Sequence, residues 1–128
     1  MDKQLKARAT VICHRGDRIL LVRKPEAKWN LPGGKIETDE GPGDAALREL
    51  GEETGLIADV IEFLALHRFD RRAHHVFRMA VPESLAARPQ NEIAACGWFS
   101  PEDFHRLAMK RPCLELLRLY CSQPARAS

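Results

Sequence analysis

The chain has 128 residues, of which 45% are hydrophobic and 30% are charged. Globular proteins have this composition, whereas disordered chains are poorer in apolar residues. Twenty basic residues against eighteen acidic ones give a formal net charge of +2, so the charge balance points neither to a nucleic-acid polymer nor to a membrane surface as a partner. At this length we expect a single domain spanning residues 1–128.

Nothing in the sequence indicates export or membrane insertion. Residues 1–6 lack an apolar leader segment, and no stretch approaches 18 consecutive apolar residues. The cysteines have no CxxC spacing, so they are expected to be reduced thiols of a cytoplasmic protein. Residues 123–128 are expected to form a frayed tail.

The first predicted elements are two strands joined by a turn. Residues 7–13 and 18–22 are rich in β-branched and aliphatic residues, and His14-Arg15-Gly16-Asp17 separates them. This pattern predicts a β-hairpin. Further along, Leu31-Pro32-Gly33-Gly34 predicts a tight turn whose exposed backbone can approach a metal ion or a phosphate closely.

A helix is predicted to begin at Pro42 and to end at Gly55. The fixed φ of proline suits the first helical position, and glycine supplies the usual left-handed end. On a helical wheel, three glutamates project from one face, beside an apolar stripe that is expected to face the core. The glutamates are Glu49, Glu52 and Glu53, and the stripe comprises Ala46, Leu47, Leu50 and Thr54.

The three glutamates indicate a cation site. Like charges four residues apart on a helix oppose folding by roughly 0.2–0.5 kcal/mol per pair, so their accumulation suggests a compensating ion. Oxygen ligands in this number suit Mg²⁺ or Mn²⁺ better than zinc, and Mg²⁺ commonly shares its coordination with substrate phosphates. The alternative is a solvated helix face on which Arg48 pairs with Glu52.

The remaining segments predict strands followed by helices. Ser100-Pro101-Glu102-Asp103 predicts a helix start that is capped by the serine hydroxyl. A last helix after Pro112 has Leu114, Leu117 and Cys121 along one side. The strand patterns lie at residues 56–69, 75–81 and 93–99, with a loop at residues 82–90. The periodicity therefore predicts a mixed α/β fold.

The segment 34–56 resembles the complete signature of the Nudix hydrolase family. Glu40 follows Gly34 after five residues, and Arg48-Glu49-Leu50 follows after seven more. Glu52-Glu53 and Gly55-Leu56 then complete the pattern. The resemblance implies the α/β/α sandwich of that family, with a mixed β-sheet between helices.

The resemblance also implies roles for the residues of this segment. Glu49 and Glu53 are expected to be direct metal ligands, and Glu52 and the carbonyl of Gly33 are expected to be further ligands. Arg48 and Glu40 are expected to hold these carboxylates in place.

The reaction implied is hydrolysis of a phosphoanhydride bond in a nucleoside diphosphate linked to another group. Mg²⁺, or Mn²⁺ in its place, would lower the pKa of a bound water and neutralise charge on the phosphates. Two carboxylates are candidates for the general base, Glu52 on the helix and Glu92 in a later loop.

Several basic and aromatic residues are candidates for substrate contacts. Arg23 and Lys35 could reach a diphosphate, with Lys24 and Lys28 as competitors for that role. Trp29 could stack on a base or pack against the glycine turn. A further basic cluster could bind a distal phosphate or form a solvated turn, and two adjacent histidines have no assigned role. The cluster comprises Arg68, Arg71 and Arg72, and the histidines are His74 and His75.

The substrate is less well defined than the reaction. The residues that characterise the ADP-ribose, dinucleoside polyphosphate and NADH branches of the family are absent downstream of residue 56. The chain most resembles small MutT-like enzymes, so we expect a nucleoside triphosphate pyrophosphohydrolase that gives the monophosphate and pyrophosphate. The alternatives are a hydrolase of nucleotide-sugars or dinucleotides, a non-catalytic nucleotide-sensing Nudix module, and a structural α/β protein. A sensor would be expected to lose the glutamates of the helix, and this chain keeps them. Homodimers are common in the family, so the resemblance allows a homodimer.

Overall fold

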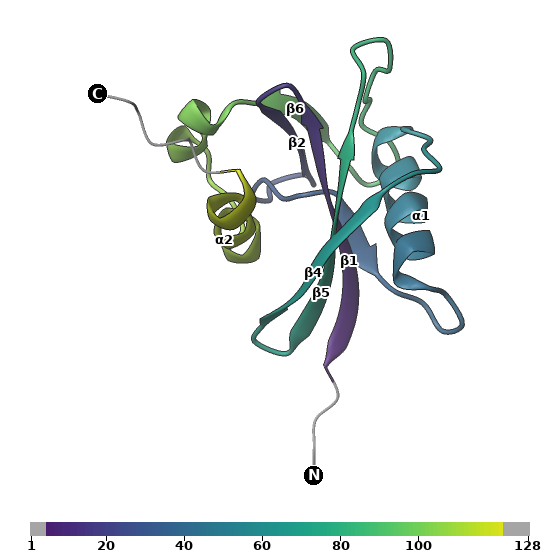
Figure 1. The fold of residues 1–128 in the computed structure, drawn as a ribbon. Coiled ribbons are helices and arrows are strands. Elements are labelled where there is room, and N and C mark those ends of the chain that lie inside the picture. The colour runs from purple at the N-terminus through teal and green to yellow at the C-terminus, as the bar shows by residue number, and fades with distance from the viewer. Residues whose placement is uncertain (1–4, 122–128) are drawn as a thin grey trace.

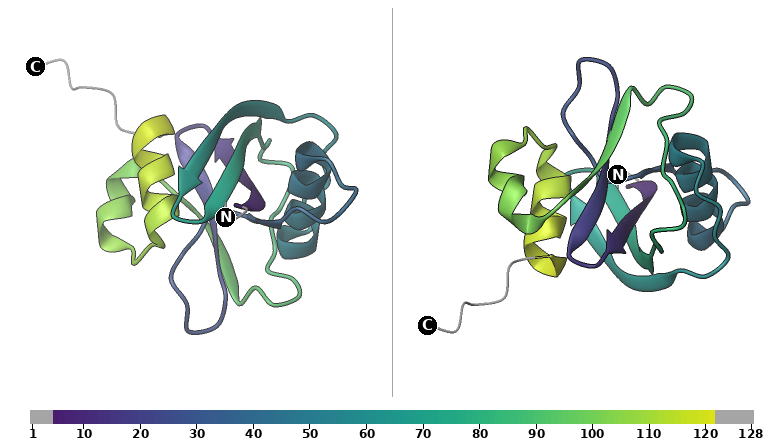
Figure 2. Two further views of the ribbon diagram at one scale, coloured as in Figure 1. Left: turned by 90° about the horizontal axis from the view of Figure 1, so that it is seen from below. Right: turned by 90° about the horizontal axis from the view of Figure 1, so that it is seen from above.

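A computed structural model describes residues 5–121 of the chain. A mixed β-sheet lies between α1 (Pro42–Thr54) on one side and α2 (Arg111–Tyr120) on the other (Figures 1 and 2). The strands are β1 (Lys6–Arg15), β2 (Arg18–Arg23), β3 (Gly33–Lys35), β4 (Glu62–Phe69), β5 (Arg72–Ala80) and β6 (Ala95–Phe99). The predicted α/β/α sandwich with a mixed sheet is confirmed.

β1 is the central strand and has three partners. The sheet order is β4-β5-β1-β2-β6, and β3 also pairs with β1. β1 and β5 are parallel, and the other pairs are antiparallel. The pairing of β1 with β2 is confined to the hairpin end, at His14 and Arg15, whereas β3 pairs with Arg8, Ala9 and Thr10. β2 therefore diverges from β1, and β3 takes its place along the first half of β1.

The predicted hairpin and both ends of α1 are confirmed. Gly16 has a left-handed φ of 60° in the turn between β1 and β2. α1 begins at Pro42, and the helix ends at Gly55 with φ 75°. Glycine adopts this left-handed φ without strain, and a Cβ on Gly55 would also have to displace the side-chain end of Gln90, whose Nε2 would lie 2.5 Å away.

The buried face of α1 differs from the predicted stripe. Leu47 is only half-buried, and Glu53 is buried together with the apolar residues. The reason is that the buried face is centred on Ala46, which leaves Leu47 at its margin. The buried residues of the helix are Ala45, Ala46, Leu50, Glu53 and Thr54.

The strands after α1 are shorter than or displaced from the predicted ones. Residues 56–61 are not a strand, because the antiparallel pairing of β4 with β5 begins only at Glu62, opposite Arg78. β5 begins at Arg72, three residues before the predicted start, because Asp70 at φ 55° turns the chain sharply between the two strands. β6 begins two residues later than predicted.

The predicted cap at Ser100 is wrong. Residues Pro101–Arg106 form a 3-10 helix, η1, and the hydroxyl of Ser100 donates to Oδ2 of Asp103 at 3.0 Å instead of accepting from a backbone N–H. The predicted last helix is present as α2, but its buried side differs from the predicted one: Cys113, Leu116 and Leu117 are buried, whereas Leu114 and Cys121 are half-buried. The expected frayed tail lies outside the described residues. Within residues 5–121, each helix is too short or too polar to span a membrane.

The core has two parts, one on each face of the sheet. Ala9, Val11 and Cys13 of β1 join the cluster beneath α1. Ile12 joins the cluster beneath α2. Because side chains alternate along a strand, Arg8 and Thr10 lie on the same face of β1 as Ile12. This alternation places an arginine at the edge of the apolar layer beneath α2.

Candidate active site

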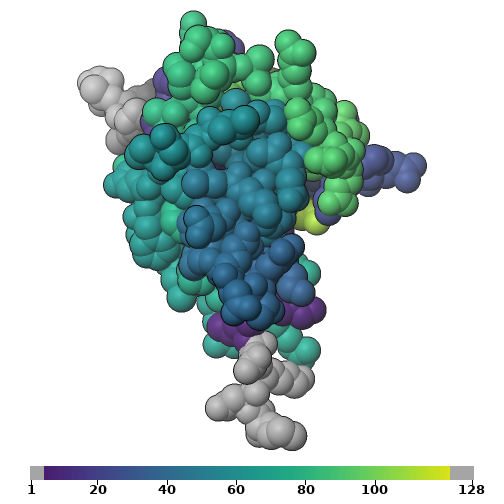
Figure 3. All heavy atoms as spheres, turned by 90° about the vertical axis from the view of Figure 1, so that its right-hand side faces the viewer, coloured from purple at the N-terminus to yellow at the C-terminus, as the bar shows by residue number. Residues whose placement is uncertain are grey.

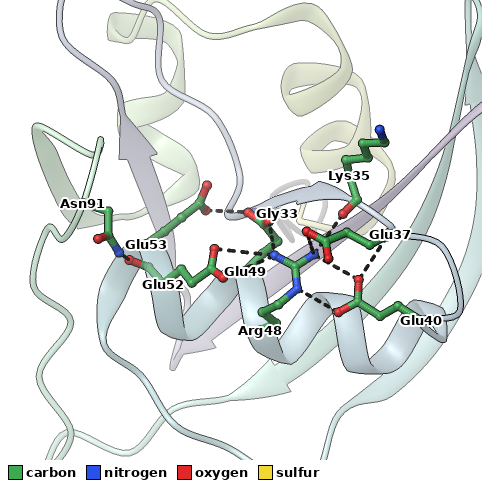
Figure 4. A network of polar contacts seen from close by, with 9 residues as sticks. All are labelled: Gly33, Lys35, Glu37, Glu40, Arg48, Glu49, Glu52, Glu53 and Asn91. Carbon is green, nitrogen blue, oxygen red and sulfur yellow. Dashed lines mark hydrogen bonds and ion pairs between the residues drawn. The ribbon is translucent and has the colours of Figure 1, made fainter.

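Arg48 is the centre of a polar network between α1, β3 and the loop before α1 (Figure 4). Its guanidinium donates two hydrogen bonds to Glu40, from Nε to Oε2 at 2.7 Å and from Nη2 to Oε1 at 3.0 Å. The backbone N–H of Glu37 also donates to Oε1 of Glu40 at 3.0 Å. These bonds, first of all those from Arg48, lower the pKa of Glu40 to about 2. The loop before α1 is therefore fastened to the helix by an ionised carboxylate.

The same guanidinium holds two of the predicted metal ligands. Nη1 of Arg48 donates to Oε1 of Glu49 at 2.7 Å and to Oε1 of Glu52 at 3.3 Å. Nη2 also donates to the carbonyl of Lys35 at 3.1 Å, which ties β3 to the helix. A Cβ on Gly34 would lie 2.4 Å from Oε2 of Glu49, so glycine is required for this carboxylate to lie against β3.

Glu53 is a buried carboxylate at the junction of α1 and β3. Its side chain is 9% exposed, and its Oε1 accepts a hydrogen bond from the N–H of Gly33 at 3.0 Å. Burial raises the pKa of Glu53 to about 7, and the charge of Glu49 contributes to the rise, whereas the bond from Gly33 opposes it. A positive charge placed beside Glu53 would therefore relieve both its desolvation and its repulsion from Glu49.

These residues fit a hard divalent cation by their chemistry. Within residues 5–121, no three His, Cys, Asp or Glu side chains are arranged as a finished metal centre. Glu49 and Glu52 instead accept hydrogen bonds from Arg48. The donors are all oxygens, and Glu49 and Glu53 repel each other, which is the situation that a bound Mg²⁺ or Mn²⁺ resolves. The predicted ligand set of Gly33, Glu49, Glu52 and Glu53 stays a prediction.

A distant loop holds the C-terminal end of α1, and the sequence did not reveal this contact. Nδ2 of Asn91 donates to the carbonyl of Glu52 at 2.6 Å (Figure 4). The backbone N–H groups of Gln90 and Arg88 donate to the carbonyls of Glu53 and Thr54 at 3.1 and 2.9 Å. These carbonyls lack partners within a helix, so the loop satisfies them. Figure 3 shows the segment after β5 against this end of the helix.

A cleft of about 290 Å³ opens beside Glu53, between β1, β5 and the start of α2. Among the described residues that line it, Glu53 is the one carboxylate. Five cationic side chains line the same cleft: Arg8, Lys24, Lys28, Arg72 and Lys110. Such a lining is suited to an anionic ligand with several negative charges.

The predicted substrate residues separate into two groups. Lys24 and Lys28 line the cleft, whereas Arg23, Lys35 and Trp29 are not among its lining residues. The guanidinium of Arg23 lies 5.0 Å from the centre of the Trp29 ring. That ring also packs edge-on against Phe99, with 5.0 Å between ring centres. Trp29 thus packs against Phe99 and Arg23, and both its stacking role and its packing against the glycine turn stay predictions. The ammonium of Lys35 points away from the network in Figure 4.

Glu92, the second candidate base, lies in the loop before β6. Its Oε2 is 3.7 Å from Nζ of Lys24, and its side chain is 73% exposed. Because Lys24 lines the cleft, this ion pair lies at the rim of the cleft. The role of Glu92 as a base stays a prediction.

Arg8 and His74 are cleft residues that the sequence analysis did not assign. The parallel pairing of β1 with β5 places them opposite each other. His74 is buried, its Nδ1 lies 3.0 Å from Oγ1 of Thr10, and burial lowers its pKa to about 4, with the charges of Arg8 and Arg72 contributing. The residues around Arg8 and His74 could not predict that the two meet in the cleft, because the two strands are more than 60 residues apart in sequence.

The fold and the site define an α/β/α protein with an acidic helix beside a cationic cleft, and comparisons with known proteins extend this description. The family model of the NUDIX domain matches residues 3–119. The CTP pyrophosphohydrolase of Escherichia coli K12 is 34% identical over 108 residues, which cover 79% of each chain. Phosphatase NudJ of Shigella boydii is 30% identical over 129 aligned positions, covering 92% of this chain and 84% of that protein.

Solved structures agree with this assignment. A putative Nudix hydrolase family member from Chromobacterium violaceum superposes with a TM-score of 0.82 at 29% identity, covering 100% of this chain and 84% of the other. The NUDIX domain of Shewanella oneidensis NrtR, solved with ADP ribose, shares the fold with a TM-score of 0.77 at 22% identity, covering 92% of this chain and 86% of that one. The chain belongs to the Nudix family and is a Nudix hydrolase.

Proposed function

We propose that this Nudix hydrolase is a metal-dependent pyrophosphohydrolase that converts nucleoside triphosphates to the monophosphate and pyrophosphate. The observation that carries the proposal is the position of Glu53, whose buried carboxylate borders a cleft lined by five cations. A triphosphate in that cleft would extend its charged chain toward the acidic helix. The names of the relatives in Escherichia coli and Shigella support a phosphate-containing small molecule as the substrate.

The acidic helix would supply the metal site. Glu49, Glu52 and Glu53, with the carbonyl of Gly33, would hold Mg²⁺ or Mn²⁺. The bound ion supplies charge neutralisation at the diphosphate and a water of lowered pKa. Arg48 acts through its hydrogen bond to Glu49 and keeps that carboxylate oriented.

The cleft would bind the phosphates. Arg8, Lys24, Lys28, Arg72 and Lys110 present positive charge along its walls. A phosphate chain with several negative charges can contact more than one of these groups at once. We assign the general base to Glu52, whose side chain is 52% exposed on the acidic face. Glu92 is the competitor, and its pairing with Lys24 would be broken before it could act.

A nucleotide panel tests the proposal. The protein is incubated with Mg²⁺ or Mn²⁺ and the common ribo- and deoxyribonucleoside triphosphates, nucleotide-sugars and dinucleotides, and products are followed by phosphorus NMR in ¹⁸O-water. We expect triphosphates to give monophosphate and pyrophosphate, with the label showing which phosphorus is attacked. The Glu53→Gln variant, purified identically, controls for contaminating phosphatases. Turnover of nucleotide-sugars or dinucleotides alone would contradict the proposed substrate class. No turnover of any nucleotide would contradict the proposal that the protein is a nucleotide hydrolase.

A further inference from the structure

The two arginines of the cleft are neighbours on the sheet. The parallel register of β1 with β5 pairs Lys6 with Arg72 and Arg8 with His74. Because paired residues share a face of the sheet, as do residues two apart on a strand, Arg8 and Arg72 project from the same face. Both line the cleft, and burial, followed by the charge of Arg72, lowers the pKa of Arg8. The two positive charges are therefore close enough to repel each other.

Arg8 is half-buried and has no ion-pair partner within residues 5–121. The other half-buried arginines of this range, Arg15 and Arg48, both donate hydrogen bonds to nearby oxygens. Arg8 makes no side-chain hydrogen bond to a described residue, and the charges of two glutamates of α1 act on it only at longer range. Among the described residues, Nε2 of His74 is the one enclosed side-chain nitrogen or oxygen without a partner, so the guanidinium nitrogens of Arg8 keep accessible surface. They are available to a ligand in the cleft.

Two neighbouring arginines match a phosphate group that carries nearly two negative charges. A terminal phosphate has a charge of about −1.5 to −2 at pH 7 and three free oxygens, whereas a phosphate linked on both sides has less charge and fewer free oxygens. Each guanidinium can donate two parallel hydrogen bonds to phosphate oxygens, which an ammonium cannot. Of the cleft lysines, Lys24 already has a carboxylate partner in Glu92. The arginine pair is therefore the part of the cleft that fits a terminal phosphate best.

We propose that Arg8 and Arg72 together bind the terminal phosphate of the substrate and thereby select substrates that have one. A nucleoside triphosphate ends in a free phosphate, whereas the diphosphate of a nucleotide-sugar or a dinucleotide is linked to a further group at both ends. The pair favours the first class over the second. The inference rests on the proposed function, because it assumes that a nucleotide occupies the cleft.

Kinetics with CTP and its γ-methyl ester test this selectivity, and CTP is chosen because a relative is named as a CTP pyrophosphohydrolase. The ester adds one methyl group and removes the second charge of the terminal phosphate. We expect the wild-type kcat/KM to be about tenfold higher for CTP than for the ester, through KM. In Arg72→Gln and in Arg8→Gln that ratio should fall to about two or less. A wild-type ratio near one would overturn the proposal, as would a ratio that the variants leave unchanged, since the ester would then be rejected by its size.

The preceding arginine supplies the matched control. Arg71 is exposed, lies directly before β5 and is not among the residues that line the cleft. Its carbonyl accepts a hydrogen bond from the N–H of Lys6, which a side-chain substitution keeps. Arg71→Gln removes the same charge outside the cleft and should leave the ratio of CTP to ester turnover unchanged. A fall as large as in Arg72→Gln would show a general effect of charge and would overturn the assignment.

Binding of inorganic triphosphates tests the phosphate subsite without turnover, metal or base. Linear triphosphate has terminal phosphates, whereas cyclic trimetaphosphate has the same phosphorus atoms and no terminal group. In EDTA, we expect calorimetry to show that the wild type and Arg71→Gln bind the linear ion at least about tenfold more tightly, and that Arg72→Gln loses most of this preference. Equal affinities in the wild type would overturn the proposal. If no nucleotide is hydrolysed but this preference is present, the proposed reaction fails and the phosphate subsite stands.

Discussion

Glu53 is a buried carboxylate whose ionisation costs the metal-free protein stability. A carboxylate in this position must be desolvated, and its pKa of about 7 lies well above its ordinary value of 4.5. A raised pKa means that the folded state binds the proton more tightly than the unfolded state. The stabilisation is complete below about pH 4.5 and is lost as the pH rises through 7. At pH 8 the ionised Glu53 therefore destabilises the metal-free protein.

Glu53→Gln should separate activity from stability. We expect turnover to fall about a thousandfold, since a lost metal ligand removes several kcal/mol of charge stabilisation. The amide still has an oxygen to accept the hydrogen bond from Gly33, so the melting temperature at pH 8 without metal should equal or exceed that of the wild type. Calorimetry and the nucleotide assay measure the two quantities. A variant that is unfolded, or one with near-wild-type turnover, would contradict this account of Glu53.

Gly34 is predicted to be required by Glu49 and not by its own backbone angles. In Gly34→Ala, the new Cβ would lie 2.4 Å from the present position of Glu49 Oε2 and would displace that carboxylate. Misplacing a catalytic group by about 1 Å costs on the order of a hundredfold in rate, so we expect kcat to fall by that factor. Gly43→Ala is the matched control, because its Cβ would make an ordinary contact of 3.9 Å with Phe77. Equal activity in the two variants would refute the argument.

At the scale of elements, local sequence patterns predicted the hairpin and the first helix, whereas the cleft depends on the pairing of strands that are far apart in sequence. The hairpin turn and the two ends of α1 were predictable because proline and glycine act through their own backbone angles. The glutamate face was predictable from the helical period. The cleft was not, because it depends on the parallel pairing of β1 with β5, which brings Arg8 opposite His74. Residues 56–61 were predicted to be a strand because they are apolar. Apolar content does not show where the pairing of β4 with β5 begins.

The loop before β6 is predicted to position α1 for metal binding. Asn91 adopts φ 54°, which glycine also tolerates, so Asn91→Gly removes the hydrogen bond to Glu52 while keeping the backbone path. We expect a loss of about 1 kcal/mol in the free energy of unfolding. We also expect about a tenfold rise in the Mg²⁺ concentration for half-maximal activity, with little change in the nucleotide KM.

Gln90 provides the control for this loop. Gln90→Ala removes a side chain near Gly55 but keeps the backbone N–H that donates to Glu53. Its Mg²⁺ requirement should match the wild type. If Asn91→Gly lost stability without any change in Mg²⁺ requirement, the loop would be purely structural, contrary to the positioning role.

At the scale of the whole molecule, two buried groups give the metal-free protein opposite responses to pH. The pKa of His74 is lowered from 6.5 to about 4, so its folded state binds the proton less tightly than its unfolded state. Its stabilising contribution is complete above about pH 6.5 and is lost as the pH falls to 4. Glu53 has the reverse dependence, since its contribution is lost as the pH rises from 4.5 to 7. Between pH 4.5 and 6.5 the two responses oppose each other.

Single variants should expose each response in turn. In His74→Phe, the histidine response disappears, so the free energy of unfolding relative to the wild type should fall as the pH rises from 4 to 6.5. In Glu53→Gln, the relative value should rise as the pH rises from 4.5 to 7, because the penalty of ionising Glu53 is absent. Each change should amount to at most about 3 kcal/mol.

Urea titrations of metal-free protein at half-unit pH steps measure both differences, and subtracting the wild-type curve removes the shared background of surface groups. Two difference curves with the same sign would show that these groups are not the buried pair that controls the response. Added Mg²⁺ should suppress the Glu53 part alone, because a cation beside that carboxylate removes the reason for its raised pKa, whereas His74 lies with Thr10 on β1 and β5.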